Sequence, residues 1–166
     1  MSPALPRRLA LMRHAKSAWD TDAPTDHARP LNPRGRRDAP RMGAWLLARG
    51  WVPDLVVLSD SARTRETWTR LAPALPNQPA VIESARLYHA GLDALRAHAE
   101  TWPTAARTVL ALGHNPGWEE AQSSLSGRWE TMTTANVALL QGRGSTWVEA
   151  LAGGWSREAF GRPKEI

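Results

Sequence analysis

Cysteine is absent from this 166-residue sequence. Disulfide bonds, thiolate nucleophiles and cysteine-ligated zinc are therefore excluded, and the absence fits the cytoplasm, where we expect the protein to reside. No apolar run approaches the ~20 residues of a membrane-spanning helix. The charged N-terminal residues are not followed directly by an apolar segment, so we expect neither a membrane anchor nor a secretory signal.

Tyrosine, phenylalanine and lysine are also scarce. One tyrosine and one phenylalanine stand against nine tryptophans, which are scattered along the chain and which we interpret as packing residues. Lysine occurs only as Lys16 and Lys164, so the net charge of +5 is carried by arginine. Arginine suits bidentate phosphate recognition, and a basic surface attracts anions, although charge alone does not separate this role from simple solubility. Without a nucleic-acid motif or an arginine–tryptophan stripe, we expect a phosphorylated substrate as partner and no nucleic acid.

Motifs for metal or nucleotide chemistry are missing as well. Carboxylates and histidines do not cluster at metal-ligand spacing, so we expect no metal. Neither a GxxxxGK[ST] loop nor a GxGxxG segment after a strand is present. The sequence therefore predicts a protein that works without a cofactor.

What is present is an alternation of apolar runs and amphipathic stretches. The length predicts one domain over residues 1–166, with a loose tail at 1–6 and a polar tail at 153–166. We expect strands at 7–12, 54–59, 80–83, 108–113, 136–140 and 146–151, the last two joined as a hairpin. We expect helices at 33–49, 61–72, 92–102 and 118–125. The alternation predicts an α/β fold, a three-layer α/β/α sandwich with a mostly parallel central sheet.

Polar residues stand where three of the predicted strands end. The first strand ends at Arg13 and His14, the second leads through Ser59 to Arg63, and the third ends at His114. Parallel strands bring their carboxyl ends to one edge of a sheet, where ligands of such folds bind. Two histidines and at least two arginines in one crevice are typical of a phosphate pocket, with cationic forks for phosphoryl oxygens and an imidazole as nucleophile or proton carrier.

These segments resemble the histidine phosphatase superfamily, in its phosphoglycerate-mutase-like branch. The resemblance covers about residues 8–126 and is carried by four segments in order, which are Leu-Met-Arg-His-Ala-Lys-Ser at 11–17, Arg-Pro-Leu-Asn-Pro-Arg-Gly-Arg at 29–36, Ser-Asp-Ser-Ala-Arg-Thr-Arg-Glu-Thr at 59–67 and Gly-His-Asn-Pro-Gly at 113–117. The short chain, the Ala-Lys-Ser after the first histidine and the stretch at 87–90 are most similar to SixA-type phosphohistidine phosphatases. The resemblance implies a phosphoglycerate-mutase-like fold.

The resemblance also implies roles for individual residues. His14 would be the nucleophile that becomes phosphorylated, and Arg13 and Arg63 would bind the phosphoryl oxygens. His114 would complete the pocket and stabilise the charge of the transition state. The proton donor of the family is usually a glutamate ahead of the third segment, and Glu83 matches that position best.

Three further residues in or near the first motif are candidate phosphate neighbours. Lys16 and Ser17 follow the first histidine closely and are equally well explained as loop residues. Asp20 stands where many relatives carry an asparagine that touches the phosphate. An ionised acid would repel phosphate there, so Asp20 would be protonated, turned away or involved in proton transfer. We interpret His27, His89 and His98 as ordinary histidines, with His89 the hardest of them to dismiss.

The sequence therefore predicts a metal-independent phosphatase that acts through phosphohistidine at position 14. Its substrate would be a phosphohistidine on a signalling protein or a small phosphoester. The chain lacks the extra length with which mutases of the branch close over a sugar acid. The alternative is a noncatalytic module of the same fold that binds phosphate or a phosphoprotein. The oligomeric state is not predicted.

Overall fold

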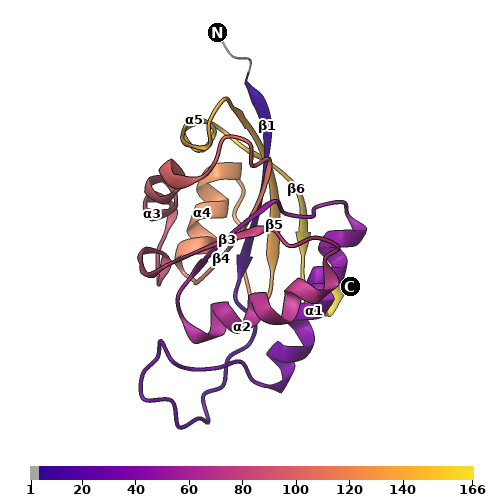
Figure 1. The fold of residues 1–166 in the computed structure, drawn as a ribbon, viewed down its shortest axis with the longest axis vertical. Coiled ribbons are helices and arrows are strands. Elements are labelled where there is room, and N and C mark those ends of the chain that lie inside the picture. Colours follow the sequence, from indigo (N-terminus) through magenta and orange to yellow (C-terminus); the bar gives the residue numbers. More distant parts are fainter. Residues whose placement is uncertain (1–3) are drawn as a thin grey trace.

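The computed structural model describes residues 4–166, which form a six-stranded sheet with helices on both faces (Figure 1). The strands are β1 (Leu5–Arg13), β2 (Leu55–Ser59), β3 (Ala80–Ser84), β4 (Thr108–Gly113), β5 (Val137–Gly144) and β6 (Ser156–Gly161). Their order across the sheet is β3-β2-β4-β1-β5-β6. β1 to β4 are mutually parallel where they pair, and β5 runs antiparallel to both β1 and β6. The predicted mostly parallel sheet is confirmed.

Helices cover the sheet in two layers. One layer holds α1 (Pro33–Ala48) and α2 (Ala62–Leu71), and the other holds α3 (Leu92–His98), α4 (Gly117–Ser126) and α5 (Trp147–Ala152). Short 3-10 helices lie at Ala72–Ala74, Ala85–Leu87, Ala99–Thr101 and Pro163–Glu165. Alternate residues of β1 serve the two layers, because Leu9 and Leu11 belong to one hydrophobic cluster while Ala10 and Met12 belong to the other. The predicted α/β/α sandwich is confirmed.

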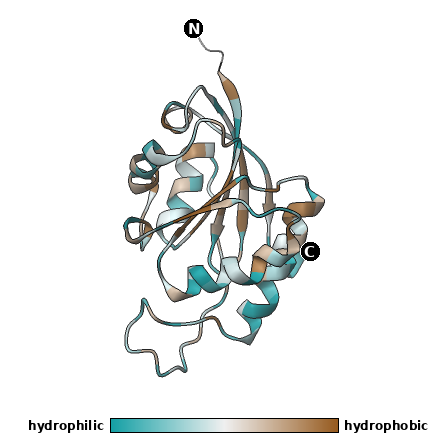
Figure 2. Ribbon diagram, in the orientation of Figure 1, coloured by the Kyte–Doolittle hydropathy of each residue, from teal (hydrophilic) through white to brown (hydrophobic). Residues whose placement is uncertain are grey.

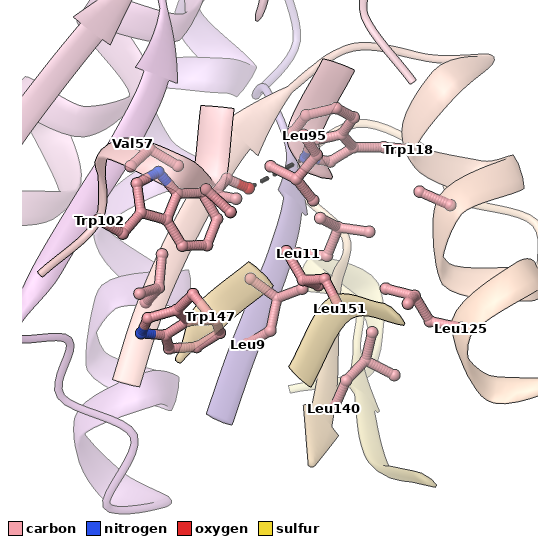
Figure 3. Packing of buried hydrophobic residues seen from close by; sticks show 14 of the residues in the cluster. Leu9, Leu11, Val57, Leu95, Trp102, Trp118, Leu125, Leu140, Trp147 and Leu151 are labelled. Atoms are coloured by element: carbon pink, nitrogen blue, oxygen red, sulfur yellow. Dashed lines mark hydrogen bonds between the residues drawn. The ribbon is translucent and has the colours of Figure 1, made fainter. Parts of the chain in front are cut away.

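Tryptophans fill much of the core on the α3–α5 side (Figure 3). Trp118 and Trp147 are completely or almost completely buried, and the Trp118 indole N–H donates to the Ala111 carbonyl oxygen over 3.0 Å. The central strands are mostly hydrophobic, whereas the helices around them mix hydrophobic and hydrophilic residues (Figure 2). Most tryptophans therefore pack as expected, whereas Trp19 and Trp129 are exposed to 74% and 60%.

The helix starts that frame the site follow from local capping. The Asn32 side chain accepts from the Gly35 amide over 2.9 Å, and Pro33 occupies the first helical position of α1. The Ser61 side chain accepts from the Thr64 amide at the start of α2. A Cβ on Gly35 would overlap the carbonyl oxygen of Lys16, so only glycine lets α1 begin against the loop that follows β1.

The structure differs from prediction in its last third. The strand predicted at 146–151 is wrong, because Thr146 caps α5 and most of the segment is helical. The predicted hairpin is also wrong, because β5 pairs with β6, which follows that helix. The polar tail predicted at 153–166 is also wrong, since it contains β6 and a 3-10 helix. At the other end β1 already begins at Leu5, within the predicted tail, whose residues 1–3 lie outside the described residues.

Within residues 4–166, no helix has the length and apolar character needed to cross a membrane.

Candidate active site

The ends of β1, β2 and β4 meet at one rim of the sheet. Arg13 pairs in register with Gly113, and the His14 amide donates to the Gly113 carbonyl oxygen over 3.0 Å. Leu58 of β2 pairs with Leu112 of β4. The three polar strand ends that the sequence singles out are therefore adjacent, and a cavity of about 220 Å³ opens between them.

The cavity combines predicted and unpredicted residues. Five of the residues proposed from the sequence line it: Arg13, His14, Ser17, Arg63 and His114. Seven more complete the lining: Lys16, Trp19, Asp26, Arg29, His89, Asn115 and Thr134.

His14 is held as a neutral imidazole with a defined tautomer. Its Nδ1 lies 2.7 Å from the Ala15 carbonyl oxygen, which can only accept, so Nδ1 carries the hydrogen. Arg63 Nε, which can only donate, lies 3.3 Å from His14 Nε2, so Nε2 carries the lone pair. The pKa of His14 is lowered to about 3, mainly by burial and also by the neighbouring Arg63 and Arg13 cations, against the opposing effect of the Ala15 hydrogen bond. Both contacts and the low pKa leave Nε2 unprotonated, with its lone pair directed toward Arg63.

The two arginines approach His14 from different elements. Arg63 lies in the first turn of α2 and is 2% exposed. Its guanidinium donates to the Asp26 backbone oxygen over 2.8 Å and to the Asp26 carboxylate over 3.1 Å. Arg13 donates from Nη1 to the Met132 carbonyl oxygen over 3.1 Å, and its buried Nε has no hydrogen-bond partner among residues 4–166. Burial lowers the pKa of Arg13, while Glu119 opposes that shift.

His114 stands opposite His14, with 5.3 Å between their ring centroids. Its Nε2 lies 2.7 Å from the Ser59 hydroxyl, and its buried Nδ1 has no hydrogen-bond partner in the part of the chain that the structure describes. The pKa of His114 is lowered to about 2, mainly by burial, with smaller contributions from the nearby His14 and Arg63. A neutral His114 can present one N–H to an anion in the cavity.

Ser17 reaches the cavity but is engaged by a neighbour. The side chain is buried, and its hydroxyl accepts from Arg29 Nη1 over 2.9 Å. Arg29 also donates to the Asp26 carboxylate over 3.0 Å and stacks on Trp19, with 3.7 Å between its guanidinium carbon and the ring centroid. Ser17 therefore orients Arg29 at the rim of the cavity.

Asp20 and Glu83 are not among the cavity-lining residues. Asp20 is exposed on the loop after β1. Glu83 lies on β3, the edge strand, where it pairs in register with Leu58 of β2. Its carboxylate forms an ion pair with Arg65. Three strand spacings of ~4.8 Å separate β3 from β1, about 14 Å in all, which accounts for the distance of Glu83 from His14.

Asp26, Arg29 and His89 are the charged or titratable lining residues that sequence reasoning left without an assigned role. Arg29 begins the second motif, and its position in that motif was the available signal. Asp26 lies three residues earlier in a stretch rich in turn formers, where acids are common for local reasons. His89 belongs to the SixA-like stretch at 87–90 but has no partner nearby in the sequence.

Residues 4–166 contain no group of three or more histidine, aspartate or glutamate side chains that could hold a metal ion.

Comparison with known proteins agrees with this geometry. Residues 9–91 match the family model of the histidine phosphatase superfamily, branch 1. An uncharacterised chloroplastic protein of Arabidopsis thaliana is 37% identical over 175 residues, which cover 98% of this chain and 80% of that protein.

Solved structures show the same relationship. A protein of Nakamurella multipartitia, described provisionally as the phosphohistidine phosphatase SixA, superposes with a TM-score of 0.85 at 28% identity, over 98% of this chain and 99% of its own. A similarly described protein of Agrobacterium tumefaciens gives 0.80 at 25% identity, over 96% and 99% of the two chains. With its sheet order, paired histidines and matched motifs, this chain belongs to the histidine phosphatase superfamily.

Proposed function

We propose that the protein is a metal-independent phosphatase that works through a phosphohistidine intermediate on His14. The observation that carries this proposal is the fixed tautomer of His14, whose Nε2 lone pair faces Arg63 in the cavity. An imidazole held neutral by burial needs no separate base before it attacks phosphorus.

The surrounding groups would stabilise the phosphoryl group during transfer. Arg63 leaves His14 Nε2 when the phosphoryl group arrives, and its guanidinium then binds phosphoryl oxygens together with Arg13. The partnerless Nε of Arg13 is a ready donor for this purpose. When the Ser59 hydroxyl donates to His114 Nε2, His114 Nδ1–H donates to a third oxygen.

The size of the cavity favours a phosphoryl group that protrudes from a larger molecule. Its volume of about 220 Å³ is below the range of roughly 300–1,000 Å³ usual for small-molecule sites. We therefore favour a phosphohistidine presented by a signalling protein over a small phosphoester; phosphohistidine is the group named in the descriptions of the two SixA-like structures.

The decisive experiment is hydrolysis of 4-nitrophenyl phosphate and of a phosphohistidine-bearing protein in the presence of a metal chelator. We expect turnover by the wild type, an acid-labile phosphoenzyme, and a loss on the order of 10⁴-fold in His14→Ala, because the attacking atom is gone. His27→Ala is the matched control, since His27 bonds to Asp60 and does not line the cavity.

A noncatalytic phosphate-binding module remains the second candidate, and the position of Glu83 outside the cavity favours it. It predicts binding of vanadate or phosphate without turnover and without a phosphoenzyme. That combination in the wild type would overturn the phosphatase proposal.

A further inference from the structure

His89 occupies the cavity in a backbone conformation that few residues adopt. Its φ is +52°, in the left-handed region, where non-glycine residues are uncommon and where strain gathers at functional sites. The segment is pressed against the start of α4, because a Cβ on Gly117 would overlap the Ala90 carbonyl oxygen. This close packing puts the His89 ring centroid 4.9 Å from that of His114.

His89 is paired with the carboxylate that faces it across the cavity. Its Nε2 lies 3.3 Å from Asp26 Oδ2, an oxygen that also accepts from the Tyr88 hydroxyl and from Arg63. The hydrogen bond from Tyr88 holds the pKa of Asp26 well below its usual range, and Arg29 and Arg63 act in the same direction against the effect of burial. Asp26 is therefore an anion at neutral pH, so it orients the His89 ring rather than donating a proton itself.

We propose that His89 is the general acid and base of the reaction, with Asp26 as its positioning residue. The proposal rests on the phosphatase function proposed above. It gives His89 the role that the sequence assigned to Glu83, and it rests on the position of His89 in the cavity and on its contact with Asp26.

The chemical steps balance with these groups and water alone. His14 Nε2 forms a bond to phosphorus while the bond from phosphorus to the leaving group breaks, and His89 gives its proton to the leaving atom. The leaving group departs neutral, and a water molecule takes its place. Neutral His89 then accepts a proton from that water as its oxygen bonds to phosphorus, and the bond between phosphorus and His14 breaks, which releases phosphate and leaves His14 neutral and His89 protonated, as at the start.

The test compares two leaving groups in His89→Asn, because asparagine tolerates the left-handed conformation better than most residues. Phenyl phosphate releases a strongly basic phenolate that needs a proton, whereas 4-nitrophenyl phosphate releases a stabilised anion. We expect kcat/KM for phenyl phosphate to fall by about 100-fold and that for 4-nitrophenyl phosphate by about 5-fold or less. Equal losses on both substrates would overturn the assignment. His27→Asn, outside the cavity, should leave both rates unchanged.

Chemical rescue separates proton transfer from a structural role. His89→Gly suits the positive φ and leaves room for added imidazole, which should restore phenyl phosphate hydrolysis in a concentration-dependent way. Activity that imidazole does not raise would count against the proposal.

The same two leaving groups test Asp26. His89 contacts the Asp26 carboxylate, the His114 ring and the adjacent Tyr88 ring. In Asp26→Asn we expect kcat/KM for phenyl phosphate to fall more than that for 4-nitrophenyl phosphate, because the proton donor is no longer oriented. We expect no further discrimination between the two substrates when His89→Asn is added, because both changes act on one step. Equal losses on both substrates in Asp26→Asn would contradict the positioning role. If the wild type hydrolyses neither phosphate ester nor phosphohistidine, the phosphatase proposal itself fails and this one falls with it.

Discussion

His14 combines two properties that usually oppose each other, a nucleophilic lone pair and a densely cationic surrounding. Arg13, Arg29 and Arg63 all lie close enough to disfavour its protonation, and burial disfavours it most. The same arginines that would bind a phosphoryl group therefore also keep its acceptor neutral. One arrangement of charges would therefore serve both the binding of a phosphoryl group and the attack on it.

We predict that His14 stays neutral far below the pH at which histidine ordinarily titrates. Its pKa of about 3, against an ordinary value of 6.5, means that less than about a tenth is protonated at pH 4.5. The ¹⁵N shifts of the imidazole should keep a protonated Nδ1 and an unprotonated Nε2 between pH 8 and 4.5. His14→Asn identifies the signals, and a titration midpoint near 6.5 would show that the lone pair is not protected.

At the scale of elements, the region after β5 shows where local patterns mislead. Trp147 and Val148 are typical of strands, yet the buried residues of this segment are Trp147, Ala150 and Leu151, spaced as on one face of a helix. Thr146 and Glu149 stand at capping-box spacing, a signal of a helix start that was present in the sequence. β6 is different: it is a half-exposed edge strand with one large apolar side chain, Phe160, so its hydrophobic pattern is weak.

The cap of α5 can be measured directly. Thr146 accepts from the Glu149 amide over 3.1 Å, and Thr146→Ala removes that bond. We expect the free energy of unfolding in urea to fall by about 1 kcal/mol, and Thr146→Ser, which keeps the hydroxyl, to change it by less than about 0.5 kcal/mol. Equal losses in the two variants would mean that the cap contributes nothing.

For the whole molecule, the sequence predicts the elements through α4 well, because buried parallel strands read as continuous apolar runs and polar residues mark their ends. Arg13, His14, Arg63 and His114 were found together for this reason. The residues at the opposite rim of the cavity were not predicted, because Asp26 and His89 are 63 residues apart in the sequence and meet only through tertiary packing. Glu83 is the opposite case. Its position in the sequence fits a motif, but it lies on the edge strand of the sheet, away from the cavity.

Buried neutral histidines also make stability depend on pH. His14 and His114 have folded-state pKa values of about 3 and about 2, below the ordinary 6.5. At pH values between each folded-state pKa and 6.5, the unfolded chain binds a proton that the folded chain does not. The free energy of unfolding therefore falls as the pH drops below about 6.5.

Each such histidine contributes a slope of about 1.4 kcal/mol per pH unit across most of that window. Urea unfolding at pH values from 7 to 4.5 should therefore give a shallower acid loss in His14→Asn than in the wild type, by about that amount per unit. The lower limit of pH 4.5 keeps Asp26, whose lowered pKa acts below about pH 4, out of the comparison. If the free energy of unfolding falls with pH equally in the two proteins, His14 becomes protonated in the folded protein within this pH range, contrary to the prediction.

The path of β1 has a practical consequence for how the protein is handled. β1 runs through the sheet from Leu5 to Arg13 (Figure 1). A strand rises ~3.3 Å per residue, so the start of β1 lies about 26 Å from Arg13 and the cavity that it lines. A bead, chip or carrier protein attached ahead of Leu5 lies at the opposite rim of the sheet. Protein immobilised in this way presents its cavity outward, where a substrate as bulky as another folded protein still has access.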